Sequence, residues 1–368
     1  MKTSLFFLLD HYPELPYSVA DRYRATIDQC VEADELGYDT VWIAEHHFHQ
    51  LGTAPNPAVL LAAIAARTTR LRVAPGVAVL PMRPALYTAE NYAMVDAISG
   101  GRLNLGLGMG NSSWELAGVG VDTDERRDIY RAALAEIADR FEGAAAGEFD
   151  RESINVACTQ QPVPPLFIAS TSTDGAYQVG RAGSSLLTIS NPRTANTAEV
   201  GDRVRAHRQG LTDAGIDPDT KQAVVVAFGF CAPTAEEARE HGGQALARLA
   251  HNKTGIELDP NDCYDQLTTQ GTAVLGDPNQ AATLIARFAD EGISHLAFFN
   301  AFGGLPAELN TNSIRLLASA AQPTPPASYP PDPGENQQPR QRSESGLRDI
   351  HPQLHPRQEP TTTESKPR

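Results

Sequence analysis

The chain has 368 residues, 41% of them hydrophobic and 20% charged, with a formal net charge of −15 and a pI near 5.1. This length is enough to bury one large core or two ordinary ones. The acidic balance leaves no basic surface to neutralise phosphates, so we expect neither nucleic acid nor a membrane as a partner.

The amino terminus and the cysteines both indicate a cytoplasmic protein. The apolar run Leu5 to Leu9 is too short for a signal-peptide core or a membrane span. Scattered cysteines without a Cys-x-x-Cys pair are typical of reduced, buried thiols, and the chain has four of this kind: Cys30, Cys158, Cys231 and Cys263.

Short apolar runs alternate with amphipathic stretches over the first 320 residues. The runs are rich in Val, Ile, Leu and Phe and mostly lack strict alternation, as expected of strands buried on both faces. Between them, Val19–Leu36, Pro84–Ile98 and Arg126–Phe141 are predicted helices. The predicted strands are Thr3–Leu9, Tyr38–Ala44, Leu71–Leu80, Arg102–Gly108, Pro165–Ala169, Ser184–Ile189, Gln222–Phe230 and Ile293–Phe299.

Eight strands, each followed by a helix, predict an α/β protein with a (β/α)8 TIM barrel over residues 1–320. The extra length falls in two predicted loop insertions, Glu142–Pro164 and His251–Gly276. A doubly wound sheet is the alternative, although it normally uses fewer strands. Residues 321–368 hold 11 of the 27 prolines and no Phe, Trp, Val or Met, which predicts a Pro-rich disordered tail; a Pro-rich docking ligand is the alternative.

The carboxyl ends of the strands form the working face of a TIM barrel, and the second predicted strand ends in a histidine cluster. A histidine titrates near neutrality, so His46 can donate or accept a proton, with Glu45 to position it. The competing interpretation is a metal site, because His47 and His49 share one face of an extended segment. We expect no metal, because the remaining candidates lie in helices or loops or at the wrong end of strand eight: His207, His241, His251 and His295.

Two further segments at strand ends are candidate ligand sites. The glycines at 106, 108 and 110 lack the spacing of a dinucleotide fingerprint, and we expect them to let a planar ligand approach the backbone. After strand five, amide groups and hydroxyls at a helix amino terminus suit a phosphate, although a helix cap needs only one of these residues. The hydroxyl residues are Ser170, Thr171, Ser172 and Thr173.

Several motifs, in the same order along the chain, resemble the bacterial luciferase-like monooxygenases. The resemblance runs from about Lys2 to Ala320 and leaves only the predicted tail outside it. The matching segments are Asp39–Phe48, Asn56-Pro57, Ala89–Asp96, Ser99–Arg102 and Phe302–Pro306.

This resemblance implies a barrel that binds reduced FMN and uses O2 to oxygenate a small organic substrate, such as an aldehyde or a natural-product intermediate. It places the catalytic histidine at His46, and a flavin contact at a cis peptide between Gly76 and Val77. The FMN phosphate is expected at residues 170–173. Members of the family often have an arginine where this chain has Met109, and a charge-assisted bond is about twice as strong as a neutral one.

The missing arginine implies loosely held FMN, which suits a cofactor supplied by a separate NAD(P)H:flavin reductase; a homodimer is also compatible with the resemblance. An apolar wall for the site is expected from five aromatic residues. Three alternatives stay open: a deazaflavin-dependent oxidoreductase on the same barrel, a metal-dependent TIM-barrel hydrolase, and a catalytically silent flavin-binding relative. The wall residues are Phe6, Phe48, Trp114, Phe230 and Phe302.

Overall fold

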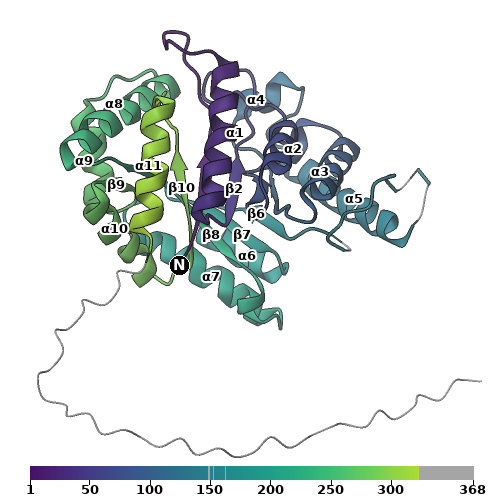
Figure 1. Ribbon diagram of the computed structural model, residues 1–368. Coiled ribbons are helices and arrows are strands. Elements are labelled where there is room, and N and C mark those ends of the chain that lie inside the picture. Colours follow the sequence, from purple (N-terminus) through teal and green to yellow (C-terminus); the bar gives the residue numbers. More distant parts are fainter. Residues whose placement is uncertain (148–149, 152, 162, 323–368) are drawn as a thin grey trace, which may run out of the picture. The chain divides into compact units, whose positions relative to one another are not determined.

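Parallel strands form a nearly closed barrel with helices around it (Figure 1). The computed structural model describes residues 1–147, 150–151, 153–161 and 163–322. The predicted α/β TIM barrel is confirmed. Its strands are β1 (Lys2–Phe7), β2 (Thr40–Ile43), β3 (Arg72–Pro75), β4 (Ala78–Val79), β5 (Leu105–Gly108), β6 (Leu166–Ala169), β7 (Ser185–Ile189), β8 (Ala223–Cys231), β9 (Val274–Gly276) and β10 (His295–Asn300).

The strand order places the chain's first and last barrel strands side by side. The path runs β3-β2-β1-β10-β8-β7-β6-β5-β4, and β9 pairs with β8 off this path. The ends of the path, β3 and β4, are neighbours in the chain, and a bridge between Val73 and Leu103 draws β3 toward β5. The predicted third strand is thus two short strands, interrupted at Gly76-Val77, where the peptide bond is cis as predicted.

Local sequence explains the helix boundaries. The first helix matches its predicted range because Ser18 and Asp21 form a capping box at its start and Gly37, at φ 83°, ends it. The helices are α1 (Val19–Leu36), α2 (Pro57–Arg67), α3 (Ala85–Ser99), α4 (Ser113–Gly118), α5 (Arg126–Ala146), α6 (Thr173–Arg181), α7 (Thr197–Asp213), α8 (Ala235–Thr254), α9 (Pro260–Gln270), α10 (Pro278–Asp290) and α11 (Ala307–Ala320), with 3-10 turns at Leu80–Met82 and Pro218–Thr220.

Aromatic side chains fill the inside of the barrel. Trp42 and Phe167 meet edge to face at 5.1 Å, and Phe228 stacks on Phe299 at 4.6 Å. Three residues of the predicted apolar wall belong to this buried core, because they are at most 7% exposed, whereas the other two lie at the surface. The buried three are Phe6, Phe230 and Phe302.

The second predicted insertion contains secondary structure, and the predicted tail lies almost entirely outside the described residues. The insertion at 251–276 is not a plain loop, because it carries α9 and the three-residue strand β9, which is too short to show a periodic pattern. The predicted tail lies outside the described residues from 323 on. In the described part of the chain, no helix has the length and apolarity needed to cross a bilayer.

Candidate active site

The carboxyl end of β2 carries the histidine cluster, as predicted. Because all barrel strands are parallel, this end lies at the same mouth as the ends of β5 and β6. His46 is partly exposed, with 27% of its side chain accessible. Gly52 packs against its ring, since a Cβ at that position would lie 2.7 Å from the His46 Cβ.

A carboxylate from a different strand end binds this cluster. Glu115, on α4 after β5, accepts hydrogen bonds at one oxygen from Nδ1 of His46 (3.0 Å) and from the backbone N–H of His47 (2.7 Å). Nε2 of His49 lies 3.0 Å from the same oxygen. Glu115 therefore ties the loop after β2 to the loop after β5.

Glu115 is anionic in this setting. Burial raises its pKa, but the hydrogen bonds from His46 and the His47 backbone and the nearby imidazoles outweigh burial and lower the pKa to about 2. A carboxylate can only accept, so Nδ1 of His46 must carry a proton. In the neutral ring this leaves Nε2 with the lone pair, and Nε2 has no hydrogen-bond partner within the described part of the chain.

The predicted pairing of Glu45 with His46 is wrong. Glu45 is buried, and its carboxylate accepts from Nε2 of His47 (3.1 Å), from Arg83 (2.5 Å) and from the N–H of Val79 (3.3 Å). Neighbouring side chains on an extended segment point to opposite sides, so adjacent residues do not face each other. Glu45 instead connects the end of β2 to the segment after β4.

The competing metal interpretation paired His47 with His49, whereas the structure groups His49 with His46 and Glu115. The ligand atoms that lie within 4.8 Å of one another belong to His46, His49 and Glu115. However, the N–H of Leu51 donates to Nδ1 of His49 (3.2 Å), so the proton of the neutral ring sits on Nε2 and faces Glu115. Burial also lowers the pKa of His49, which favours that neutral ring. The Glu115 carboxylate therefore faces three N–H groups, and this arrangement favours hydrogen bonding to the carboxylate over coordination of a metal ion.

The predicted phosphate segment lies at the start of α6. Ser172 is the N-cap, because its hydroxyl accepts from the N–H of Gly175 (3.1 Å). Residues 171–173 are exposed, and Ser170 is partly buried. A Cβ at Gly175 would lie 2.2 Å from the Ser170 hydroxyl and 2.9 Å from that of Ser172. Glycine therefore keeps both hydroxyls close to the free amides of the first helical turn.

The glycines of the strands and of the cis peptide lie in tight packing contacts. A Cβ at Gly106 would lie 2.2 Å from the carbonyl oxygen of Pro75, and one at Gly108 would lie 2.5 Å from the Val77 side chain. Gly76 has the same constraint, because a Cβ there would lie 2.7 Å from the Phe6 ring. Packing between neighbouring segments is therefore sufficient to require glycine at these three positions. Met109, the next residue, is partly buried.

A buried ion pair between Asp10 and Arg22 lies beside this mouth of the barrel. Asp10, after β1, is fully buried and contacts Arg22 of α1 (2.7 Å) and the Tyr12 hydroxyl (2.9 Å). Arg22 also donates to the Leu305 carbonyl (3.1 Å), and Asp10 accepts from the N–H of Gly303 (2.5 Å). The pair therefore joins the loops after β1 and β10, a structural role that the sequence did not reveal.

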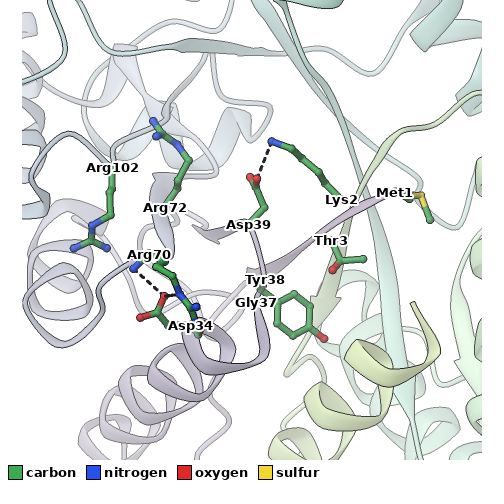
Figure 2. A pocket seen from close by; sticks show the side chains of 10 residues that line it. All are labelled: Met1, Lys2, Thr3, Asp34, Gly37, Tyr38, Asp39, Arg70, Arg72 and Arg102. Carbon is green, nitrogen blue, oxygen red and sulfur yellow. Dashed lines mark hydrogen bonds and ion pairs between the residues drawn. The ribbon is translucent and has the colours of Figure 1, made fainter. Parts of the chain in front are cut away.

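A hollow of about 610 Å³ lies at the opposite, amino-terminal end of the strands (Figure 2). Charged residues that line the hollow interact with one another: Lys2 forms an ion pair with Asp39 at 2.9 Å, and Arg70 donates hydrogen bonds to Asp34. Because TIM-barrel chemistry takes place at the carboxyl ends of the strands, we assign this hollow no part in catalysis. It is lined by Met1, Lys2, Thr3, Asp34, Gly37, Tyr38, Asp39, Arg70, Arg72 and Arg102.

Glu115 is not among the predicted site residues, although the sequence contains a signal for the start of its helix. Ser112 and Glu115 have the Ser-x-x-Glu spacing of a helix start, and the Ser112 hydroxyl does accept from the N–H of Glu115 (3.2 Å). In the usual box the glutamate side chain returns to the cap, whereas here it reaches the histidines. Only the fold reveals that contact.

Known proteins share this barrel. The luciferase-like monooxygenase family matches residues 1–295. The F420-dependent glucose-6-phosphate dehydrogenase of Kineococcus radiotolerans is 28% identical over 294 residues, covering 74% of this chain and 85% of that protein. The monooxygenase RslO1 of Streptomyces bottropensis aligns with a TM-score of 0.78 at 24% identity, covering 87% of this chain and 98% of that one.

A further structure is the oxygenating constituent of 3,6-diketocamphane monooxygenase from Pseudomonas putida, in complex with FMN. It aligns with a TM-score of 0.70 at 18% identity, covering 87% of this chain and 97% of that one. The family match extends over most of the barrel, including the strand that bears the histidines. The chain belongs to the luciferase-like monooxygenase family and is an oxidoreductase.

Proposed function

We propose that this protein is an FMN-dependent monooxygenase that receives reduced FMN from a separate NAD(P)H:flavin reductase and uses O2 to oxygenate a small organic substrate. The observation that carries the proposal is the environment of His46. Its Nδ1 is fixed by Glu115, whereas Nε2 has no partner among the described residues and lies at the carboxyl end of a barrel of this family. A histidine held in this way is suited to proton transfer.

His46, Glu115 and Glu45 have different tasks in this proposal. His46 takes up or gives up a proton at Nε2. Glu115 fixes the ring through Nδ1 and stabilises the imidazolium when it forms. Glu45 holds His47 and Arg83 and so maintains the shape of the loop. When bound, reduced FMN supplies the electrons that activate O2.

The start of α6 fits the phosphate of FMN. Two serine hydroxyls lie beside the amides of the first helical turn, and Gly175 leaves the space that a Cβ would fill. Such amides and the helix dipole favour an anion. The position of Met109 offers no cation, so neutral donors would hold the phosphate, which suits a cofactor that arrives and leaves in each cycle.

The relatives favour FMN and a reductase without deciding either. The camphane enzyme is an oxygenating constituent in complex with FMN, whereas the Kineococcus relative is F420-dependent, and F420 is a deazaflavin. The chain lacks the Gly-x-Gly-x-x-Gly unit that would bind a nicotinamide dinucleotide. We therefore propose reduced FMN from a partner enzyme, with the deazaflavin as the second candidate.

The proposal is tested by supplying the two cofactors in turn. The anaerobic protein is titrated with reduced FMN and with reduced F420, each monitored by absorbance, and is then exposed to air. We expect binding of reduced FMN and consumption of O2. Product formation from NADH should require an added flavin reductase. Turnover by the lone chain with NADH would refute the reductase requirement, and activity that survives removal of O2 would favour F420.

A further inference from the structure

Two large aromatic side chains lie exposed beside the histidine cluster. Phe48, on the loop after β2, is 58% exposed, and Trp114, on α4, is 57% exposed. Their rings meet edge to face at 5.9 Å. Large aromatic rings normally bury most of their surface, and exposed apolar surface often marks a binding site. We call Phe48 and Trp114 the aromatic platform.

The platform is continuous with the proposed catalytic histidine. The Trp114 ring stacks on His49 at 5.8 Å with an interplanar angle of 30°, and the rings of His49 and His46 lie 5.3 Å apart. The residue after Trp114 is Glu115, which binds His46. A molecule resting on the platform would therefore lie next to the imidazoles.

The backbone is arranged to hold Phe48 in this position. Its φ of 65° is in the left-handed region, which bulky side chains rarely adopt and which is frequent at functional sites. Gly118 of α4 makes room for the ring, because a Cβ there would lie 2.5 Å from Cε2 of Phe48. An exposed ring without a function would require neither the left-handed backbone at Phe48 nor the space at Gly118.

The charges beside the platform are already paired. Glu115 contacts His46 and His49, and Glu45 is buried against Arg83. Apart from Nε2 of His46, which the proposed proton transfer uses, a charged ligand group would find no unpaired partner among these described side chains. Because the two rings are nearly perpendicular, a flat apolar group would stack on one ring and contact the edge of the other. We propose that the aromatic platform receives a planar, uncharged, apolar part of the substrate. Its role as a substrate site rests on the proposed function, but the binding itself requires no flavin.

The test is flavin-free binding of a neutral planar probe. Equilibrium dialysis measures the dissociation constant of 2-naphthol, with cyclohexanol as a non-planar comparison and naphthalene-2-sulfonate as a charged one. We expect 2-naphthol to bind most tightly. Trp114→Ala and Phe48→Ala should each weaken its binding by about three- to tenfold, the range of aromatic pair energies. Trp114→Phe should retain most of the affinity, because it keeps a flat ring.

Tyr87→Ala is the matched control, because Tyr87 is an aromatic residue of α3 with the same 58% exposure as Phe48. It should leave 2-naphthol binding unchanged. Equal losses in all three alanine variants, or no loss at Trp114→Ala, would overturn the platform.

Acrylamide quenching of tryptophan fluorescence provides a second check on the exposure of Trp114, since the other tryptophan, Trp42, is fully buried. A Trp114 already shielded in the full chain would mean that another segment or a second copy covers the platform. Failure of FMN turnover with probe binding intact would refute only the proposed function.

Discussion

Three residues contact or lie beside the His46 ring. Glu115 fixes Nδ1, Gly52 packs against the ring, and the His49 ring lies 5.3 Å away. Only Nε2 remains without a partner in the described part of the chain. The proton transfer that we propose for His46 therefore depends on one nitrogen, Nε2, because Glu115 on the helix after β5 occupies Nδ1.

Replacing His46 should affect turnover rather than cofactor binding. In His46→Ala we expect the affinity for reduced FMN to stay nearly unchanged while coupled oxygenation falls by about 10²-fold or more, the usual contribution of an acid–base group. Product yield per FMN oxidised measures the effect. Normal yield in His46→Ala together with failure of His47→Ala would show that the neighbouring imidazole carries the reaction.

Glu115 should contribute to stability in a pH-dependent way. Its pKa falls from an ordinary 4.5 to about 2 in the folded chain. A lowered folded pKa stabilises the protein above the unfolded value, and the contribution is lost as the pH falls toward the folded value. The difference in unfolding free energy between the wild type and Glu115→Gln should therefore be greatest above about pH 5 and shrink between about pH 4.5 and 2. Urea denaturation across this range checks it, and a difference that is constant with pH would contradict it.

At the level of elements, two short helices position the candidate groups. α4 presents Glu115 to the histidines and Trp114 to the surface, and α6 begins with the hydroxyl residues. Both follow neighbouring strands, β5 and β6, which pair in parallel. The carboxyl ends of these strands lie at one edge, so the two helices start at the same mouth of the barrel.

The first turn of α6 provides a direct test of the phosphate site. In Gly175→Ala the new Cβ would lie 2.2 Å from the Ser170 hydroxyl, which must then move. Losing one hydrogen bond to a charged group, about 1.5–3 kcal/mol, should weaken reduced FMN binding by roughly tenfold or more. Anaerobic titration measures the affinity. Binding of 2-naphthol should be unaffected, and unchanged FMN affinity would place the phosphate elsewhere.

At the level of the whole molecule, the barrel closes around its own core. β1 pairs with both β2 and β10, and the buried pair of Asp10 and Arg22 joins the loops at that seam. The last helix in the described part of the chain, α11, ends at Ala320 and packs against the barrel strand β8. All the described strands and helices of the barrel therefore precede the Pro-rich segment.

Deleting residues 323–368 should leave the barrel stable. The predicted tail, residues 321–368, contains no Phe, Trp, Val or Met with which to add to a core. We expect the melting temperature to change by less than about 2 °C, the lower end of the shift that 1 kcal/mol produces in a domain of about 150–250 residues. Calorimetry of the full and shortened chains decides it. A fall of several degrees would show that the segment docks on the barrel.

The sequence by itself determined the barrel, the end of the barrel at which the histidine cluster lies, and the limits of α1. Buried parallel strands produce long apolar runs, and caps such as Ser18 and Gly37 act within one turn, so these features are local in the chain. Tertiary structure alone decided that Glu115, 69 residues away, rather than Glu45, binds His46. It also decided that Gly106 and Gly108 pack against Pro75 and Val77, which leave no room for a Cβ. Side-chain direction and strand spacing are set by packing between distant segments, and no local pattern encodes them.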